Sequence, residues 1–329
     1  MQKSLIFASL LASVVTFPSC LAGDNKTETT DDVKENKTEV VEPDNISAPS
    51  FSQDSAFQYV VRQCEFGPRV PNTEAHEQCA AYLSQQLTAF GAEVSLQKFT
   101  ANAYDGTELK ATNIIGTFFP EKSKRIIFFS HWDSRHTCDQ DAPQYHQTAV
   151  PAANDGASGV AVLLEIARIL KENQPNVGID MVFLDVEDYG NASGDAKSWC
   201  LGSQYWAKNP HYKTKPQFGI LLDMVGGVSP SFGIDVITQQ FAQNIASKVW
   251  DVAHSLGYQQ FKNETSGQLI DDHVFVNMTA GIPTIDIIDY SATRGFPSTW
   301  HTHLDTPENI SKETLGMVGK VLTCLIFRE

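Results

Sequence analysis

Basic residues are scarce in this 329-residue sequence, and its cysteines form no metal-binding motif. Only 24 Lys and Arg residues stand against 39 Asp and Glu residues, which gives a formal net charge of −15 at pH 7. Because nucleic-acid binding depends on clustered Lys and Arg, and no basic run is present, the composition argues against a nucleic-acid partner. The six cysteines include no C-x-x-C pair. A cysteine-based zinc site is therefore excluded, and any metal must be held by other side chains.

The N-terminal apolar run is too short to span a bilayer and has the pattern of an export signal. It extends from Leu5 to Val15 after Lys3. Cys20 follows Ser19 and resembles the lipidated cysteine of bacterial lipoproteins, although Phe17 stands where Leu is commoner. Ordinary signal-peptidase cleavage shortly after this point is the alternative. We expect an exported, periplasmic protein whose only link to the membrane is a lipid anchor at Cys20.

The rest of the chain divides into a tether and one folded domain. Residues 21–50 are mostly Thr, Glu, Asp, Asn and Lys, with eight acidic residues against three Lys, as in a solvated, disordered segment. The chain as a whole is 42% hydrophobic and 10% aromatic, which is ordinary globular composition. We predict a signal peptide at 1–20, an acidic tether at 21–50 and a single catalytic domain at 51–329.

Strand-like apolar runs alternate with helical patterns in the predicted domain. Strands are expected at 113–119, 125–130, 179–186, 218–224 and 283–288. Helices are expected at 74–91, 156–170, 196–208, 239–253 and 311–326. This order predicts an α/β fold with a central, mostly parallel twisted sheet and helices on both faces. Ligands bind such sheets at the carboxyl ends of the strands.

Acidic residues or histidines lie directly after, or close to, several of these apolar runs. The segments are 130–134, 153–156, 184–188, 222–224 and 300–303. A single Asp at such a position is more often a helix N-cap or a turn residue. The adjacent carboxylates Glu187 and Asp188 repel each other unless a cation lies nearby, although a solvated acidic loop is the alternative. The five segments together favour a shared site.

His301 adds an imidazole to this set of carboxylates. A lone His is more often structural than a ligand. Asp155, Asp188 and His301 would nevertheless supply two oxygen ligands and one nitrogen, with a fourth position open, which is the pattern of a catalytic zinc. Glu187 would stand beside the metal and move protons.

The chain resembles the zinc aminopeptidase superfamily, and within it the glutaminyl cyclases of Bacteroidetes-type bacteria. The resemblance extends from about Phe66 to the C-terminus. It rests on the motifs F-G-P-R-V-P at 66–71, H-W-D-S-R at 131–135, N-D-G-A-S-G at 154–159 and D-D-H at 271–273. It implies an aminopeptidase-like fold and a glutaminyl-peptide cyclotransferase, an acyltransferase that converts the N-terminal Gln of peptides or proteins to pyroglutamate and releases ammonia.

The resemblance also implies a role for particular residues. Asp155, Asp188 and His301 resemble the ligands of a single zinc, with one Zn²⁺ per chain, and Glu187 resembles the general acid/base. Animal cyclases carry Glu where Asp188 stands.

The same resemblance points to residues that would contact the substrate. Asp223 and Asp271 resemble acids that steer the substrate and form a hydrogen-bonded pair near it. Trp300 resembles the indole of the substrate pocket. Trp199 is a second candidate for that pocket, with plain core packing as the alternative. Asp286, where animal cyclases carry His, lies near the expected site and has no assigned role.

Two other functions remain open at the level of the sequence. A two-zinc aminopeptidase would use Glu187 to activate water. Its ligands would be His131, Asp155, Asp188, Asp223 and His301. A non-catalytic surface lipoprotein that binds peptides is the third possibility, but such proteins usually lose a ligand or the base. Trp300 and Asp271 favour the cyclase. Its substrates would be peptides or proteins with an N-terminal Gln, and we expect it to be a monomer.

Overall fold

The computed structural model of this protein describes residues 48–329. The predicted signal peptide with Cys20, and residues 21–47 of the predicted tether, lie outside the described residues. Among the helices of residues 48–329, none is long and apolar enough to cross a membrane.

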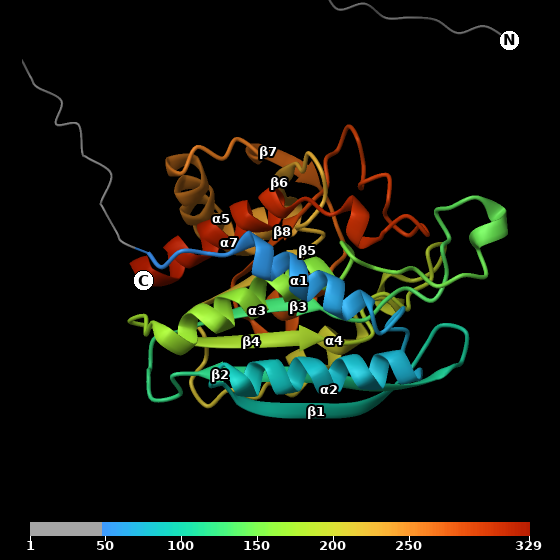
Figure 1. Cartoon of the computed structure of the whole chain (residues 1–329), viewed down its shortest axis with the longest axis horizontal. Helices are drawn as coiled ribbons and strands as arrows, with labels where there is room; N and C mark the ends of the chain where they lie inside the picture. Colours follow the sequence, from blue (N-terminus) through green and yellow to red (C-terminus); the bar gives the residue numbers. More distant parts are fainter. Residues whose placement is uncertain (1–47) are drawn as a thin grey trace, which may run out of the picture. The chain divides into compact units, whose positions relative to one another are not determined.

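A six-stranded sheet forms the centre of the domain (Figure 1). Its strand order is β1-β2-β4-β3-β5-β8. The pairs β4–β3, β3–β5 and β5–β8 are parallel, whereas β1–β2 and β2–β4 are antiparallel. Strands β6 and β7 form a separate parallel pair. The strands are β1 (Glu93–Asn102), β2 (Glu108–Phe118), β3 (Arg125–His131), β4 (Gly178–Leu184), β5 (Phe218–Asp223), β6 (Phe232–Asp235), β7 (Phe261–Gly267) and β8 (Thr284–Ile288).

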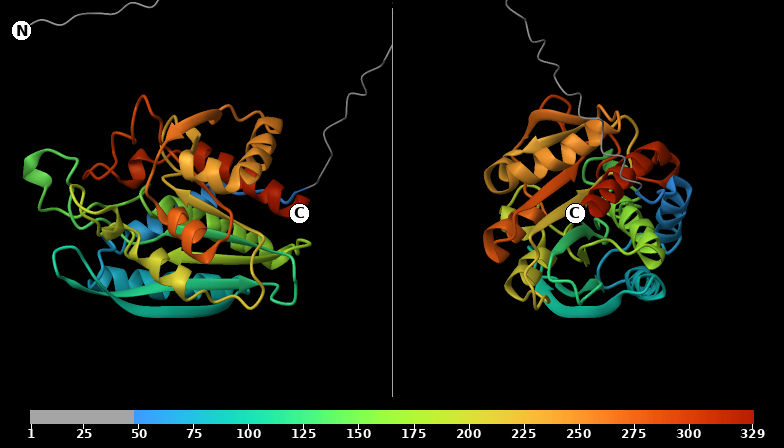
Figure 2. Two further views of the ribbon diagram at one scale, coloured as in Figure 1. Left: turned by 180° about the vertical axis from the view of Figure 1, so that it is seen from behind. Right: turned by 90° about the vertical axis from the view of Figure 1, so that its left-hand side faces the viewer.

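Helices cover both faces of this sheet. On one face α1, α3 and α7 pack against one another, as two further views show (Figure 2). Helix α2 covers β1 and β2 and contacts α3, while α4 and α6 lie against the opposite face. The helices are α1 (Gln53–Cys64), α2 (Glu74–Ala89), α3 (Ala157–Glu172), α4 (Leu201–Lys208), α5 (Val236–Ser255), α6 (Asp272–Phe275) and α7 (Lys312–Arg328), with short turns η1 (Pro143–Tyr145), η2 (Ala196–Ser198), η3 (Val276–Ala280) and η4 (Pro307–Asn309).

Every residue of the central strand β3 is buried, because helices cover it on both sides. Successive side chains of a strand point to opposite faces. Ile126 and Phe128 accordingly belong to the large core under α1, α3 and α7, whereas Ile127 and Phe129 belong to the smaller core with Trp206 of α4. This two-sided burial explains why β3 appears in the sequence as a continuous apolar run.

The predicted α/β fold with a mostly parallel sheet is confirmed. The structure differs from the sequence prediction at the expected helix 196–208, which is broken into η2 and α4. Cys200 between them has a left-handed backbone, with φ 57°. The sequence patterns also missed α1, β1, β6 and β7. Strand β1 lies at the edge of the sheet and is largely exposed on alternate residues, so it lacks a long apolar run.

Candidate metal centre and active site

All eight predicted site residues line one pocket of about 410 Å³. The pocket opens where β4, β5 and β8 end, as expected for a sheet of this kind. The structure therefore brings these side chains together, and their individual roles stay predictions. The eight residues are Asp155, Glu187, Asp188, Trp199, Asp223, Asp271, Trp300 and His301.

Strained backbone lies next to several of these residues. Val186, directly before Glu187, has φ 51°, and Met224, directly after Asp223, has φ 48°. His301 itself has φ 55°. The left-handed region is unfavourable for residues other than glycine, above all for a β-branched one such as Val186. The surrounding contacts must therefore hold these turns in place.

Two groups of possible metal ligands share Asp155. In the first group, His301 Nε2 lies 3.2 Å from Asp188 Oδ1 and 3.5 Å from Asp155 Oδ2. In the second group, His131 Nε2 lies 3.1 Å from Asp155 Oδ1 and 3.2 Å from Asp223 Oδ1. The second group contains the additional ligands of the two-zinc alternative.

The first group fits a zinc ion by its chemistry and by its unsatisfied atoms. Asp155 Oδ2 and Asp188 Oδ2 are buried and have no hydrogen-bond partner. A buried carboxylate oxygen without a partner is unfavourable, and a cation would satisfy both atoms. Two carboxylates and one imidazole also match the ligands that zinc prefers at catalytic sites.

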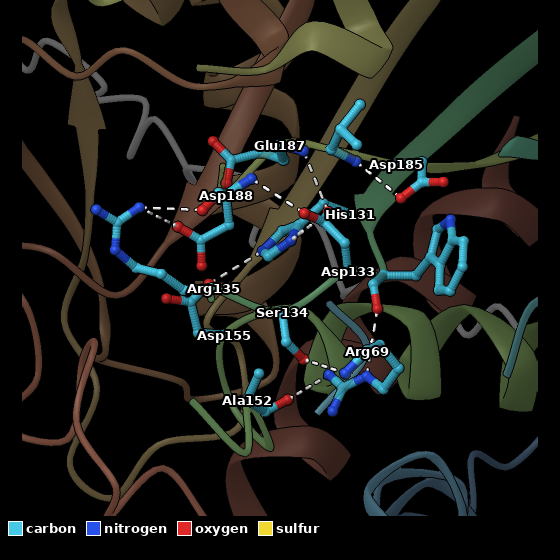
Figure 3. Close-up of polar contacts among 12 residues, drawn as sticks. Arg69, His131, Asp133, Ser134, Arg135, Ala152, Asp155, Asp185, Glu187 and Asp188 are labelled. Carbon is cyan, nitrogen blue, oxygen red and sulfur yellow. Dashed lines mark hydrogen bonds and ion pairs between the residues drawn. The ribbon is translucent and has the colours of Figure 1, made fainter. Parts of the chain in front are cut away.

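Two buried carboxylates hold the loops that carry the predicted ligands. Asp133 accepts hydrogen bonds from the backbone N–H groups of Glu187 at 3.1 Å and Asp188 at 3.2 Å (Figure 3). Asp305 accepts the backbone N–H groups of Asn154 at 2.7 Å and Asp155 at 2.9 Å. Each loop is therefore fixed by its backbone, which leaves the Glu187, Asp188 and Asp155 side chains free to face the pocket.

Arg69 and Ser134 connect the Asp155 loop to the end of β3. Arg69 donates to the carbonyl of Ala152 at 2.7 Å, and its backbone N–H donates to Ser134 Oγ at 3.0 Å (Figure 3). Arg69 is fully buried. The F-G-P-R-V-P motif thus supports the turn before Asp155 and does not enter the pocket.

Glu187 has the environment of a general base that can also carry a proton. Burial raises the pKa of Glu187 well above its usual value; His131 opposes this rise and Asp188 adds to it. The thiol of Cys200 donates to Glu187 Oε1 at 3.2 Å, and the backbone N–H of Cys200 donates to the Glu187 carbonyl at 2.9 Å. The residue before helix α4 is therefore held against Glu187, which explains the break at Cys200.

Asp223 and Asp271 lie near each other, and the hydrogen-bonded pair that the family resemblance implied stays a prediction. Among the described residues, Asp223 pairs with His131. Asp271 lies close to Asp286 and His273. Burial and the charge of Asp223 raise the pKa of Asp271 to about 6, and burial and the charge of Asp271 raise the pKa of Asp286 well above its usual value.

Aromatic side chains form the walls of the pocket. The Trp300 indole stacks on His301 with 3.8 Å between ring centroids and on Phe296 with 4.2 Å. Trp199 also lies parallel to His301, at 6.2 Å. Leu269 and Ile288 complete the apolar lining. The candidate metal ligand His301 therefore stacks on one indole and lies nearly parallel to a second.

The comparisons with known proteins agree with this arrangement. A model of peptidase family M28 matches residues 113–326. The crystal structure of a Bacteroides thetaiotaomicron glutaminyl cyclase bound to N-acetylhistamine is 49% identical, has a TM-score of 0.84, and the match covers 86% of this chain and 99% of that chain. The chain belongs to peptidase family M28, and within it to the bacterial glutaminyl cyclases.

Other members of the family differ in name and in coverage. The crystal structure of a leucine aminopeptidase precursor from B. thetaiotaomicron is 48% identical, with a TM-score of 0.83, over 86% of this chain and 99% of that chain. The bovine glutaminyl-peptide cyclotransferase is 24% identical over 251 residues, and the match covers 65% of each chain. The chain thus spans slightly less than two thirds of the length of that relative.

Several residues around the site were not predicted from the sequence. Asp305 and Cys200 act on the backbone or side chains of predicted residues, and Asp139 accepts from His301 Nδ1 at 3.0 Å. Asp305 follows His301 by four positions and Asp139 follows the H-W-D-S-R motif by four. For Asp305 and Asp139, closeness in sequence to a motif was the one signal that could have identified them. Their contacts join loops that are distant in sequence.

We expect zinc binding to release at least one proton near pH 7.5. Burial alone would lower the pKa of His301, but Asp188, Asp139 and Asp155 raise it from 6.5 to about 9. Zinc must displace that proton, so the apparent zinc affinity should fall as the pH drops below about 9. Without zinc, the raised pKa stabilises the fold below pH 6.5, and this contribution is lost as the pH rises through about 9.

Calorimetric zinc titrations in buffers of different ionisation enthalpy would count the protons. His303→Ala, which changes the neighbouring imidazole outside the pocket lining, should keep the proton count of the unchanged protein. His301→Ala should abolish tight zinc binding. Zinc binding without proton release would contradict the prediction.

Proposed function

We propose that this protein is a zinc-dependent glutaminyl-peptide cyclotransferase. The observation that carries the proposal is a partly buried carboxylate, Glu187, beside the ligand group Asp155, Asp188 and His301, in a pocket walled by indoles. The 49% identity with a B. thetaiotaomicron glutaminyl cyclase over 86% of this chain supports it. We further propose that the substrates are peptides or proteins with an N-terminal Gln.

The reaction joins the substrate's α-amine nitrogen to its side-chain carboxamide carbon. The bond from that carbon to the carboxamide nitrogen breaks, and ammonia leaves. Glu187 takes one proton from the attacking amine and passes one proton to the departing nitrogen, so no water is consumed. A carboxylate with a raised pKa suits both steps, because it must accept and then release the same proton.

Asp155, Asp188 and His301 would hold the zinc, which when bound supplies Lewis-acid polarisation of the side-chain carbonyl. We propose one zinc per chain. His131 supports this number, because its Nε2 lies within hydrogen-bond distance of Asp155 and Asp223 and can join them as a protonated imidazole. Burial alone would lower the pKa of His131, but Asp133, Asp155 and Asp223 raise it well above its usual value.

The other pocket residues would orient the substrate. Asp223 and Asp271 present acidic oxygens beside Glu187, where the α-amine must lie to attack, and the indoles of Trp300 and Trp199 would enclose the folded side chain. Because the reaction is intramolecular, the substrate itself supplies most of the proximity. The walls chiefly have to fold the Gln side chain back and exclude water.

A two-zinc aminopeptidase is the second candidate. The observation in its favour is the ligand group of His131, Asp155 and Asp223, which adjoins the first group. The similarity to a leucine aminopeptidase precursor is consistent with it. In that case Glu187 would activate a water molecule, and the first residue of the peptide would be released.

We expect a peptide that begins with Gln to lose the mass of one ammonia molecule on incubation with the zinc-loaded protein. The reason is that cyclisation expels the carboxamide nitrogen and adds nothing. Mass spectrometry together with an ammonia assay measures this directly. The same peptide with an N-terminal Asn serves as the control, because its shorter side chain would close a strained four-membered ring. Release of free N-terminal Gln would instead establish the aminopeptidase.

We expect Glu187→Gln to lower kcat by at least about 100-fold, the usual contribution of general acid/base catalysis. Zinc content should remain about one per chain by elemental analysis, since the proposed ligands are unchanged. Glu165→Gln, at a fully buried glutamate on α3 outside the pocket, is the matched control and should keep its activity. Unchanged turnover in Glu187→Gln would mean that another group is the base. Two zincs in the wild-type protein would favour the aminopeptidase.

We also propose that the protein is exported to the periplasm and held at the membrane by a lipid on Cys20. The support is the sequence pattern at residues 1–20 alone. In a bacterial expression host, the full chain should fractionate with membranes and incorporate labelled fatty acid. Cys20→Ser should move it out of the membrane fraction or leave it unprocessed, while Cys64→Ser should change nothing. Absence of label in the unchanged chain would refute the anchor.

A further inference from the structure

Arg135 follows β3 and does not line the pocket. It contacts Asp188 of the candidate ligand group and Trp199 of the pocket wall. Its side chain is 2% exposed and points toward Asp188 in the close-up (Figure 3). We propose that Arg135 is a positioning residue that fixes the metal ligands Asp188 and His301 and the pocket indole of Trp199 in one arrangement. This inference rests on the proposed zinc site, but zinc affinity tests it without any cyclase activity.

The first contact of Arg135 reaches His301 through Asp139. Arg135 donates from Nε to Asp139 Oδ1 at 2.9 Å and from Nη2 to Asp139 Oδ2 at 2.7 Å. Asp139 Oδ1 in turn lies 3.0 Å from His301 Nδ1. A carboxylate on the far nitrogen of an imidazole fixes its tautomer and its ring orientation, which leaves Nε2 as the metal-binding atom.

The second contact reaches Asp188 directly. Arg135 Nη1 donates to the Asp188 carbonyl oxygen at 3.0 Å and to Asp188 Oδ1 at 3.3 Å. The other carboxylate oxygen, Asp188 Oδ2, has no hydrogen-bond partner. Arg135 therefore holds one oxygen and leaves the other for the metal.

The third contact reaches the pocket wall. The guanidinium lies over the Trp199 ring, with 4.6 Å from Cζ to the ring centroid. Nη1 and Nη2 both lie 3.3 Å from the carbonyl of Gly190. A Cβ atom at Gly190 would come within 2.0 Å of the Trp199 ring, so the Gly190 backbone packs directly against the indole. Arg135 thus contacts both ends of the segment from Gly190 to Trp199.

These contacts require the shape of a guanidinium as well as its charge. Arg has a planar, rigid fork of donors that can bind a carboxylate through two atoms and stack on an aromatic ring. Lys carries the same charge on one ammonium nitrogen, so it can make only some of the contacts that Arg135 makes. Arg135→Lys therefore removes the geometry while keeping a cation beside Asp139 and Asp188.

The experiment measures zinc affinity by competition with a chelator and steady-state kinetics on a Gln peptide. Arg135→Lys should weaken zinc binding by about 10- to 100-fold, the usual effect of losing a group that orients metal ligands. It should also raise KM severalfold, even with saturating zinc, because Trp199 loses its partner. Asp139→Asn should weaken zinc binding and leave KM unchanged. Trp199→Leu should raise KM and leave zinc affinity unchanged.

Arg125 supplies the matched control. It is buried at the start of β3 and binds Asp180 through Nε at 2.9 Å and Nη2 at 2.8 Å, at the opposite end of the strand from the pocket. Arg125→Lys should lower the melting temperature but change neither zinc affinity nor KM. Equal zinc affinity in Arg135→Lys and the unchanged protein, or equal losses in Arg135→Lys and Arg125→Lys, would overturn the inference.

Two further results keep the test decisive. If Arg135→Lys does not fold, as judged by circular dichroism, zinc affinity in Asp139→Asn decides: a loss supports the inference, and no change refutes it. If no variant cyclises a Gln peptide, the proposed function fails. The zinc measurements on Arg135→Lys and Asp139→Asn still decide the role of Arg135.

Discussion

The mutual repulsion of buried carboxylates is the constraint on which this site depends. Asp155, Glu187, Asp188, Asp223 and Asp271 line one pocket. Removing an ion from water is unfavourable by several kcal/mol, and like charges at short distance add to that penalty. The protein responds in two ways: some of these carboxyl groups have raised pKa values, and others lie beside a cation. A zinc ion in the group of Asp155, Asp188 and His301 would relieve the repulsion between Asp155 and Asp188.

The scaffold keeps these groups close in spite of the repulsion. The parallel strands β3, β4 and β5 end at the same edge of the sheet, so the residues that follow them must meet there. Asp133 and Asp305 then bind the backbone of the two loops. The left-handed residue Val186 is stable only because these contacts outweigh its strain. Stability of the core and geometry of the site are therefore coupled.

The carboxylates of the site have different neighbours, and their pKa values differ for that reason. Glu187 is partly buried beside the thiol of Cys200 and has a raised pKa, which suits a proton carrier. Burial alone would raise the pKa of Asp188, but His301 and Arg135 lower it below its usual value, which suits a metal ligand. Adjacent acids thus acquire opposite properties from their neighbours in space. One scaffold can support cyclisation or hydrolysis, so the choice between them depends on the pocket and the metal number.

The sequence by itself determined the class of fold and pointed to the acids and the histidine of the site, whereas Asp271 and Trp300 were implied by the family resemblance. Continuous apolar runs such as β3 predict buried parallel strands, and acids or histidines after such runs predict side chains at one edge of the sheet. These signals are local, because two-sided burial and the end of a strand both determine which residue types occur over a few consecutive positions. The broken helix at Cys200 and the edge strand β1 were not predictable in this way, since the first depends on a contact with Glu187 and the second has no continuous apolar run.

Only the tertiary structure decided how the site residues are paired. It placed Asp223 beside His131, and Asp271 beside Asp286 and His273. It also joined Arg135 to Asp139, His301 and Trp199. The physical reason is that hydrogen bonds and ion pairs act over about 3 Å between atoms whose residues are far apart in sequence. No local pattern records which carboxylate each cation reaches.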